Sequence, residues 1–128
     1  MHSVVHIVED DPQYSNLLKE MAEQFGWQCQ VHTDAKRFTR NIPSKGILIL
    51  DLAMPDMDGI EVITKLKEAK SELMVILNSG MDESMLLCAE TLATSNNITV
   101  LGCLQKPTPL HELIRLLEKA KETKPQTT

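Results

Sequence analysis

Short runs of apolar residues divide this chain at regular intervals and predict its strands. Residues 3–8 (SVVHIV), 47–50 (ILIL) and 74–77 are rich in Val, Ile and Leu, a composition typical of strands buried in a sheet. Shorter runs near residues 27–31 and 98–101 predict two further strands. The chain therefore contains five candidate strands.

Segments with apolar residues at helical spacing separate these runs. The first predicted helix starts with Asp11 as its cap and Pro12 at its first position, and Gly26 follows its last turn. Its apolar stripe consists of Tyr14, Leu17, Leu18, Met21, Ala22 and Phe25. Further helices are expected over residues 35–41, 58–67 and 83–94, and from a Thr108 cap onward with Leu110, Leu113, Ile114 and Leu117 buried.

Five strand-helix pairs at short spacing predict one α/β domain with a parallel sheet covered by helices on both faces. We expect the domain to span residues 1–121, followed by a polar tail or the start of a linker at residues 122–128. In such folds, ligands bind beyond the carboxyl ends of the strands.

The composition narrows the class of protein. The chain has 128 residues and a formal net charge of −5, which argues against a general nucleic-acid-binding surface. No apolar run is long enough to cross a membrane, and the early acidic residues do not fit a secretory signal. Cys29, Cys88 and Cys103 lack metal-ligand spacing, so we expect reduced, buried thiols. A cytoplasmic protein is the simplest interpretation.

Polar residues follow four of the predicted strands, where the ends of a parallel sheet would bring them together. They are Glu9, Asp10 and Asp11 after the first strand, Asp51 after the third, Ser79 after the fourth and Lys106 after the fifth. Strand alternation predicts that the Glu9 side chain points away from its neighbour, so Glu9 is the acid least expected to take part in the site. Each residue alone also fits a structural role such as a helix cap or a turn, but their joint placement favours a site.

These side chains suit Mg²⁺-dependent phosphoryl transfer. Clustered carboxylates repel one another, and Mg²⁺ relieves that repulsion while leaving room for water and a phosphate oxygen. Asp51 would be the nucleophile that forms an acyl phosphate, Lys106 would neutralise charge, and Ser79 would donate a hydrogen bond. The histidines do not follow these strands; we expect His6 within a strand, either in the core or partly exposed, and His2, His32 and His111 on the surface.

These residues resemble the receiver domains of two-component response regulators. The segment HIVEDDP resembles the family's first strand and acidic pair, assigned here to Asp10 and Asp11. The segment DLAMPDMDG, from Asp51 to Gly59, is similar to the phosphoacceptor motif, and LNSG and LQKP are similar to the hydroxyl and lysine segments. The resemblance extends over nearly the whole chain, in the same order.

The resemblance implies a flavodoxin-like doubly wound sheet with strand order 2-1-3-4-5. It implies phosphorylation of Asp51 by a sensor histidine kinase or a histidine phosphotransfer protein. It also implies Asp11, Asp51 and the Ala53 backbone carbonyl as direct Mg²⁺ ligands, with Asp10 acting through metal-bound water. A cis peptide bond at Lys106-Pro107 would aim the lysine.

One position departs from the family pattern. Cys103 stands where receivers usually carry Tyr or Phe, three residues before the lysine. A small thiol does not sweep the volume of an aromatic ring, so we expect signalling to depend on backbone movement in the loop after Ser79, which includes Met81.

Three alternatives stay open from the sequence. A Mg²⁺-dependent aspartyl-phosphate phosphatase would usually carry an acid two residues after its nucleophile, where this chain has Ala53. A pseudo-receiver used only for protein contact would not need the intact polar set. The segment NITVLGCLQKP is also similar to receivers joined to cyclic-di-GMP phosphodiesterase domains, so the chain is either a free-standing receiver or part of a larger regulator.

Overall fold

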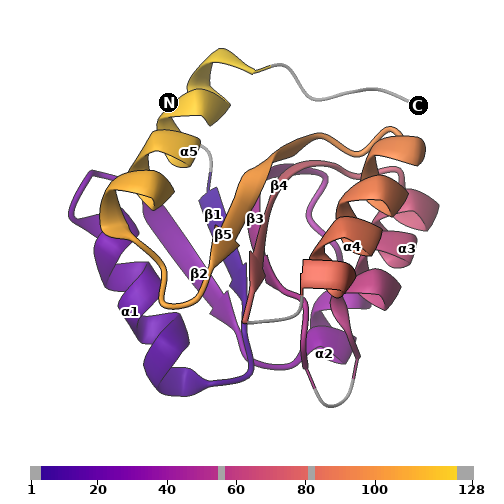
Figure 1. The fold of residues 1–128 in the computed structure, drawn as a ribbon, viewed down its shortest axis with the longest axis horizontal. Coiled ribbons are helices and arrows are strands. Elements are labelled where there is room, and N and C mark those ends of the chain that lie inside the picture. Colours follow the sequence, from indigo (N-terminus) through magenta and orange to yellow (C-terminus); the bar gives the residue numbers. More distant parts are fainter. Residues whose placement is uncertain (1–3, 55–56, 81–82, 124–128) are drawn as a thin grey trace.

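The computed structural model describes residues 4–54, 57–80 and 83–123 and contains a five-stranded sheet flanked by five helices (Figure 1). The strands are β1 (Val4–Val8), β2 (Gln28–His32), β3 (Lys45–Asp51), β4 (Glu72–Ser79) and β5 (Val100–Gln105). The helices are α1 (Pro12–Glu23), α2 (Ala35–Thr39), α3 (Gly59–Ala69), α4 (Glu83–Ser95) and α5 (Leu110–Glu122).

All neighbouring strands are parallel, and their order is β2-β1-β3-β4-β5, as the sequence resemblance implies. Helices α1 and α5 cover one face of the sheet, and α2, α3 and α4 cover the other (Figure 1). The predicted doubly wound α/β fold is therefore confirmed.

The central strands are apolar because both of their faces are covered. Ile47, Ile49 and Ile76 pack toward the α1 and α5 layer, and Leu48 and Leu50 pack toward the opposite layer. All five are at most 1% exposed. Continuous apolar strands are expected where helices shield a parallel sheet on both sides.

The last strand-helix unit differs from the sequence prediction. Strand β5 starts at Val100, later than predicted, and runs to Gln105, because Gly102 and Cys103 interrupt the apolar pattern without ending the ladder. Pro109, not Thr108, is the residue before α5, and no side chain caps this helix. Thr108 is buried instead, at 5% exposure.

Helix α1 buries a narrower stripe than its sequence pattern predicts. Leu18 and Ala22 are buried, whereas Leu17 is 41% and Phe25 is 50% exposed. Residues at the margins of a helical stripe stay in contact with solvent when the neighbouring helix covers only part of them. Within the described ranges, every helix is too short or too polar to serve as a bilayer-crossing segment.

Candidate functional site

The carboxyl ends of four strands bring acidic and basic side chains to one edge of the sheet. Glu9 directly follows β1, Asp51 is the last residue of β3, Ser79 is the last residue of β4, and Lys106 directly follows β5. The predicted convergence of these strand ends is therefore present in the fold. Ligand sites of open α/β sheets lie at this edge.

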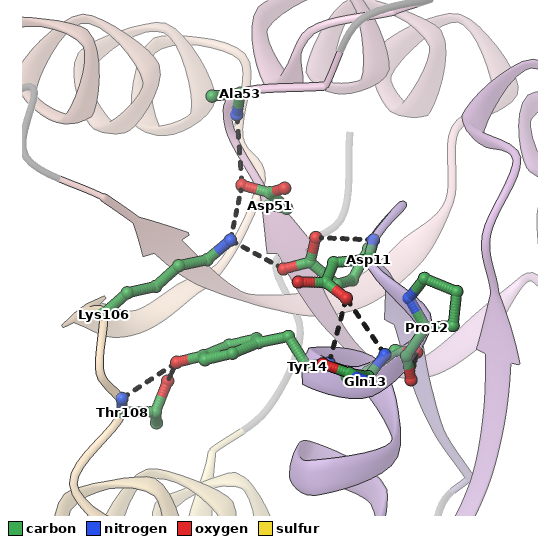
Figure 2. A network of polar contacts seen from close by, with 10 residues as sticks. Asp11, Pro12, Gln13, Tyr14, Asp51, Ala53, Lys106 and Thr108 are labelled. Carbon is green, nitrogen blue, oxygen red and sulfur yellow. Dashed lines mark hydrogen bonds and ion pairs between the residues drawn. The ribbon is translucent and has the colours of Figure 1, made fainter.

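Lys106 joins two of these strand ends through its ammonium group. Its Nζ atom donates a 2.7 Å hydrogen bond to Glu9 Oε1 and lies 3.4 Å from Asp51 Oδ1 (Figure 2). Both carboxylates are nearly inaccessible, with Glu9 1% and Asp51 3% exposed. Burial lowers the pKa of Lys106, but the hydrogen bond to Glu9 and the charge of Asp51 outweigh this effect, so its pKa is raised.

Three carboxylates form the acidic part of the site. Oxygens of Glu9, Asp10 and Asp51 lie within 4.8 Å of one another. Burial raises the pKa of Glu9, an effect that the hydrogen bond from Lys106 only partly offsets. Burial and the hydrogen-bonding contact with Glu9 also raise the pKa of Asp10. A divalent cation that prefers oxygen ligands would stabilise this arrangement of like charges.

Asp11, which the sequence paired with Asp10 as a metal ligand, is not a member of this group of three carboxylates. Its Oδ1 atom accepts hydrogen bonds from the backbone N–H groups of Gln13 and Tyr14 (Figure 2). Asp11 is thus the N-cap of α1, the structural role that its position before Pro12 predicted.

The prediction that Glu9 is the acid least expected to take part in the site is wrong. The backbone N–H of Glu9 extends the β1–β2 ladder by donating to the His32 carbonyl, and its side chain is buried beside Lys106. The N–H of Asp11 also donates to Glu9 Oε2. Simple alternation misjudged Glu9 because the chain turns toward α1 immediately after this residue.

The loop after β3 holds the Asp51 carboxylate. Asp51 Oδ1 accepts a 3.1 Å hydrogen bond from the Ala53 backbone N–H (Figure 2). Farther along, the Gly59 N–H donates to the Leu52 carbonyl, which ties the start of α3 to the residue after Asp51. Pro55 lies outside the described residues. The Ala53 N–H is thus next to the site, and metal binding by the Ala53 carbonyl stays a prediction.

The β4 and β5 ends are also joined by the main chain. The Lys106 N–H donates a 2.8 Å hydrogen bond to the Ser79 carbonyl, and Ser79 is 4% exposed. The peptide bond between Lys106 and Pro107 is cis, as the sequence resemblance implies. Met81, expected in the signalling loop, lies outside the part of the chain that the structure describes.

Tyr14 is a member of the site that the sequence did not single out. Its ring lies 4.8 Å from Lys106 Nζ, and its hydroxyl accepts a hydrogen bond from the Thr108 N–H (Figure 2). The sequence pattern indicates only that Tyr14 is one of the apolar positions of the α1 stripe. Nothing in that pattern pairs it with Thr108, which is 94 residues away.

Cys103 lies against α4 rather than at the acidic edge. Its thiol donates to Glu90 Oε2 at 3.4 Å, and burial together with Glu90 raises its pKa to about 12. An open groove of about 510 Å³ lies over Cys103 and Leu104. A small side chain at this position leaves the α4–β5 surface hollowed.

The remaining cysteines and histidines correct two further expectations. Cys29 is half-buried and Cys88 is exposed, so the prediction of three buried thiols is wrong for Cys88. His6 is buried, one of the two expected placements, but His32 is not simply a surface residue, because its Nε2 lies 3.1 Å from His6 Nδ1. His111 is exposed as predicted, and His2 lies outside the described residues.

Comparison with known proteins identifies the family. The profile of the response regulator receiver domain matches residues 5–118. This chain belongs to the response regulator receiver domain family. The receiver fold of a response regulator from Colwellia psychrerythraea superimposes with a TM-score of 0.83 at 39% identity, covering 95% of this chain and 98% of that one. The FixJ-N structure is similar at 27% identity and a TM-score of 0.80, with 95% of both chains covered.

Curated relatives of this receiver domain are longer proteins. The transcriptional regulatory protein FixJ of Rhizobium meliloti is 33% identical over 78 residues, which are 59% of this chain and 38% of FixJ. The transcriptional regulatory protein TrcR of Mycobacterium tuberculosis is 28% identical over 83 residues, which are 63% of this chain and 32% of TrcR. The receiver thus matches about a third of the length of these relatives.

Proposed function

We propose that this receiver domain accepts a phosphoryl group on Asp51 from a phosphohistidine donor and signals by a change in conformation. The observation that carries the proposal is the position of the buried Asp51 carboxylate, 3.4 Å from the Lys106 ammonium and within a group of three carboxylates. A buried carboxylate with a cation beside it is suited to attack phosphorus and to tolerate the charge that the phosphoryl group brings.

In the proposed reaction, an Asp51 oxygen forms a bond to phosphorus while the phosphorus–nitrogen bond of the donor breaks. The donor imidazole leaves with the electron pair of that bond, and its nitrogen then takes up a proton. Lys106 neutralises negative charge on the phosphoryl oxygens, and the Ser79 hydroxyl is expected to donate a hydrogen bond to one of them. The chain thereby catalyses its own modification without turning over a substrate.

We propose Mg²⁺ as the cofactor, held by Glu9, Asp10 and Asp51 together with the Ala53 carbonyl. The donor set fits this metal because it consists of carboxylate and carbonyl oxygens, without the imidazole or thiolate that Zn²⁺ prefers. Bound Mg²⁺ would neutralise phosphoryl oxygens during transfer. Asp11 is not in this proposed set because it is not a member of the group of three carboxylates, and its Oδ1 caps α1.

The partner that we propose is a sensor histidine kinase or a histidine phosphotransfer protein. Since the longer relatives extend beyond their receiver region, an attached output domain or a separate target protein is the proposed downstream element. A cyclic-di-GMP phosphodiesterase output is one candidate, on the sequence resemblance alone.

The cysteines described are free thiols, which agrees with a cytoplasmic location.

A slow loss of the phosphoryl group is proposed, in contrast to a phosphatase. Ala53 occupies the position two residues after Asp51, so no carboxylate stands there to activate water. Sustained release of phosphate from a phosphomonoester would instead support the phosphatase alternative.

We also propose that the structural unit ends near residue 121, since α5 runs to Glu122.

The test is phosphorylation by acetyl phosphate with Mg²⁺, followed by intact-mass and peptide mass spectrometry. We expect one phosphoryl group on Asp51 of the wild-type chain and no labelling of Asp51→Asn. Asp34→Asn is the matched control, because Asp34 caps α2 and Asn preserves that cap. Failure to label the wild-type chain, or equal labelling of Asp51→Asn, would exclude Asp51 as the acceptor.

A further inference from the structure

Tyr14 connects α1 to both ends of the Lys106 segment. The Tyr14 hydroxyl accepts a 2.8 Å hydrogen bond from the Thr108 N–H and is also hydrogen-bonded to the Thr108 hydroxyl (Figure 2). The Tyr14 ring lies beneath the ammonium group of Lys106, 4.8 Å from Nζ to the ring centroid. One side chain therefore contacts the lysine head group and the backbone two residues after it.

These contacts add to the two carboxylates, Glu9 and Asp51, that already hold the Lys106 ammonium. Lysine has a flexible four-carbon stem and a single charge at its end. The Lys106 side chain is 26% exposed, so packing alone leaves part of it in solvent. The Ser79 carbonyl fixes the Lys106 backbone, and the Tyr14 ring adds a contact at the other end of the side chain.

The ring contact differs in kind from the two carboxylate contacts. Glu9 and Asp51 attract the ammonium through charge, and a phosphoryl group on Asp51 would compete with Glu9 for the same cation. An aromatic face attracts a cation over a broad area and carries no net charge. The ammonium can therefore change its anionic partner while it stays over the Tyr14 ring.

We propose that Tyr14 is a positioning residue that holds the Lys106 ammonium and the loop after β5 in place for a phosphoryl group on Asp51. This inference rests on the proposed function and extends it to a residue on α1. The hydroxyl of Tyr14 fixes the loop through Thr108, and the ring fixes the ammonium. The two parts of the side chain are separable by substitution.

The experiment compares four variants with the wild-type chain. Tyr14→Leu removes ring and hydroxyl, Tyr14→Phe removes only the hydroxyl, and Thr108→Val removes only the hydroxyl of the partner residue. Phe25→Leu is the matched control, since it removes an exposed ring from the chain just after the same helix. For each we would measure the initial rate of Asp51 phosphorylation by acetyl phosphate, the Mg²⁺ dissociation constant, and the NMR shifts of the Lys106 ε-methylene.

We expect Tyr14→Leu to slow phosphorylation about three- to tenfold, the scale of a lost cation–π contact. Its Mg²⁺ affinity should stay within about twofold of wild type, because the metal ligands proposed above do not include Lys106. The Lys106 methylene protons should lose the upfield shift caused by the ring. Tyr14→Phe should retain that shift and recover most of the rate, whereas Phe25→Leu should match wild type throughout.

Three results would overturn the inference. One is a wild-type phosphorylation rate in Tyr14→Leu. The second is unchanged Lys106 methylene shifts in that variant. The third is an equal loss of rate and Mg²⁺ affinity, which would indicate general collapse of the pocket. If the wild-type chain is not phosphorylated at all, the proposed function fails, and the NMR comparison still decides whether Tyr14 holds Lys106.

Discussion

Glu9 accepts a 2.7 Å hydrogen bond from Lys106, a residue 97 positions later in the chain. This contact joins the ends of β1 and β5, which lie on opposite sides of β3 and β4 in the sheet. Because Glu9 is almost fully buried, its charge needs a partner, and the ammonium supplies it. The contact therefore assigns the first acid after β1 to the site.

The first prediction concerns which acids bind Mg²⁺. We expect Asp10→Asn to weaken Mg²⁺ binding by at least about tenfold, because it removes a charged oxygen ligand from the carboxylate group. Asp11→Asn should change affinity by less than about twofold, since Asn preserves the α1 cap. Isothermal titration of both variants with MgCl₂ makes the comparison. A larger loss in Asp11→Asn would restore the ligand pair inferred from the sequence alone.

The second prediction concerns acid sensitivity at the pair formed by His6 and His32. Burial lowers the pKa of both imidazoles below the ordinary value of 6.5, and the neighbouring His32 lowers that of His6 further. The neutral rings are therefore favoured in the folded state, and the unfolded chain binds more protons below that value. The stability from this pair is complete above about pH 6.5 and is lost as the pH falls.

Urea unfolding at about pH 7.5 and about pH 5.5 should therefore show a lower free energy of unfolding at the lower pH. His6→Phe should reduce this dependence by removing one of the two titrating rings. His111→Gln is the control, because His111 is exposed. An identical pH dependence in wild type and His6→Phe would contradict the assignment.

The third prediction ranks the reactivity of the thiols. Burial raises the pKa of Cys29 to about 11, and burial with Glu90 raises that of Cys103 to about 12. Because the thiolate is the reactive form, both should be alkylated slowly in the folded protein. Cys88 is exposed on α4 and should react first with iodoacetamide. In Cys88→Ser the fast phase should vanish, and guanidinium should make the remaining thiols reactive; fast labelling of Cys103 would refute this order.

The fourth prediction concerns Gly59, the last residue of the motif that begins at Asp51. A Cβ atom at this position would lie 2.9 Å from the Cα atom of Leu52, and backbone cannot yield as a flexible side chain can. We expect Gly59→Ala to destabilise the fold by about 1–3 kcal/mol and to slow phosphorylation, because Leu52 follows the acceptor.

Gly80→Ala is the control for that substitution. A Cβ atom at Gly80 would meet no other atom within 4 Å, so its stability should stay close to wild type. Thermal unfolding of the two variants would provide the comparison. Equal stability of Gly59→Ala and wild type would contradict the prediction, because it would show that the loop after β3 can move away from α3 at no cost in stability.

Local patterns predicted much of the fold. The continuous run of Ile47–Leu50 indicated a strand covered on both faces, and the Asp11-Pro12 pair indicated the start of a helix. Both features depend on neighbouring residues, so they are readable from a single sequence. The continuation of β5 to Gln105 was not predictable from the apolar pattern, because it passes through Gly102, which lies closely against Leu116 of α5.

The sequence by itself determined the alternation of strands and helices and placed Asp51 and Lys106 at strand ends, because apolar periodicity and strand order fix these features. Only the tertiary structure decided that Glu9 rather than Asp11 faces the lysine, and that Tyr14 contacts Thr108 and Lys106. Those choices depend on where the chain turns after β1 and on contacts between residues more than 90 positions apart. Such contacts leave no periodic signal in a sequence, since side-chain direction is set only when the elements pack together.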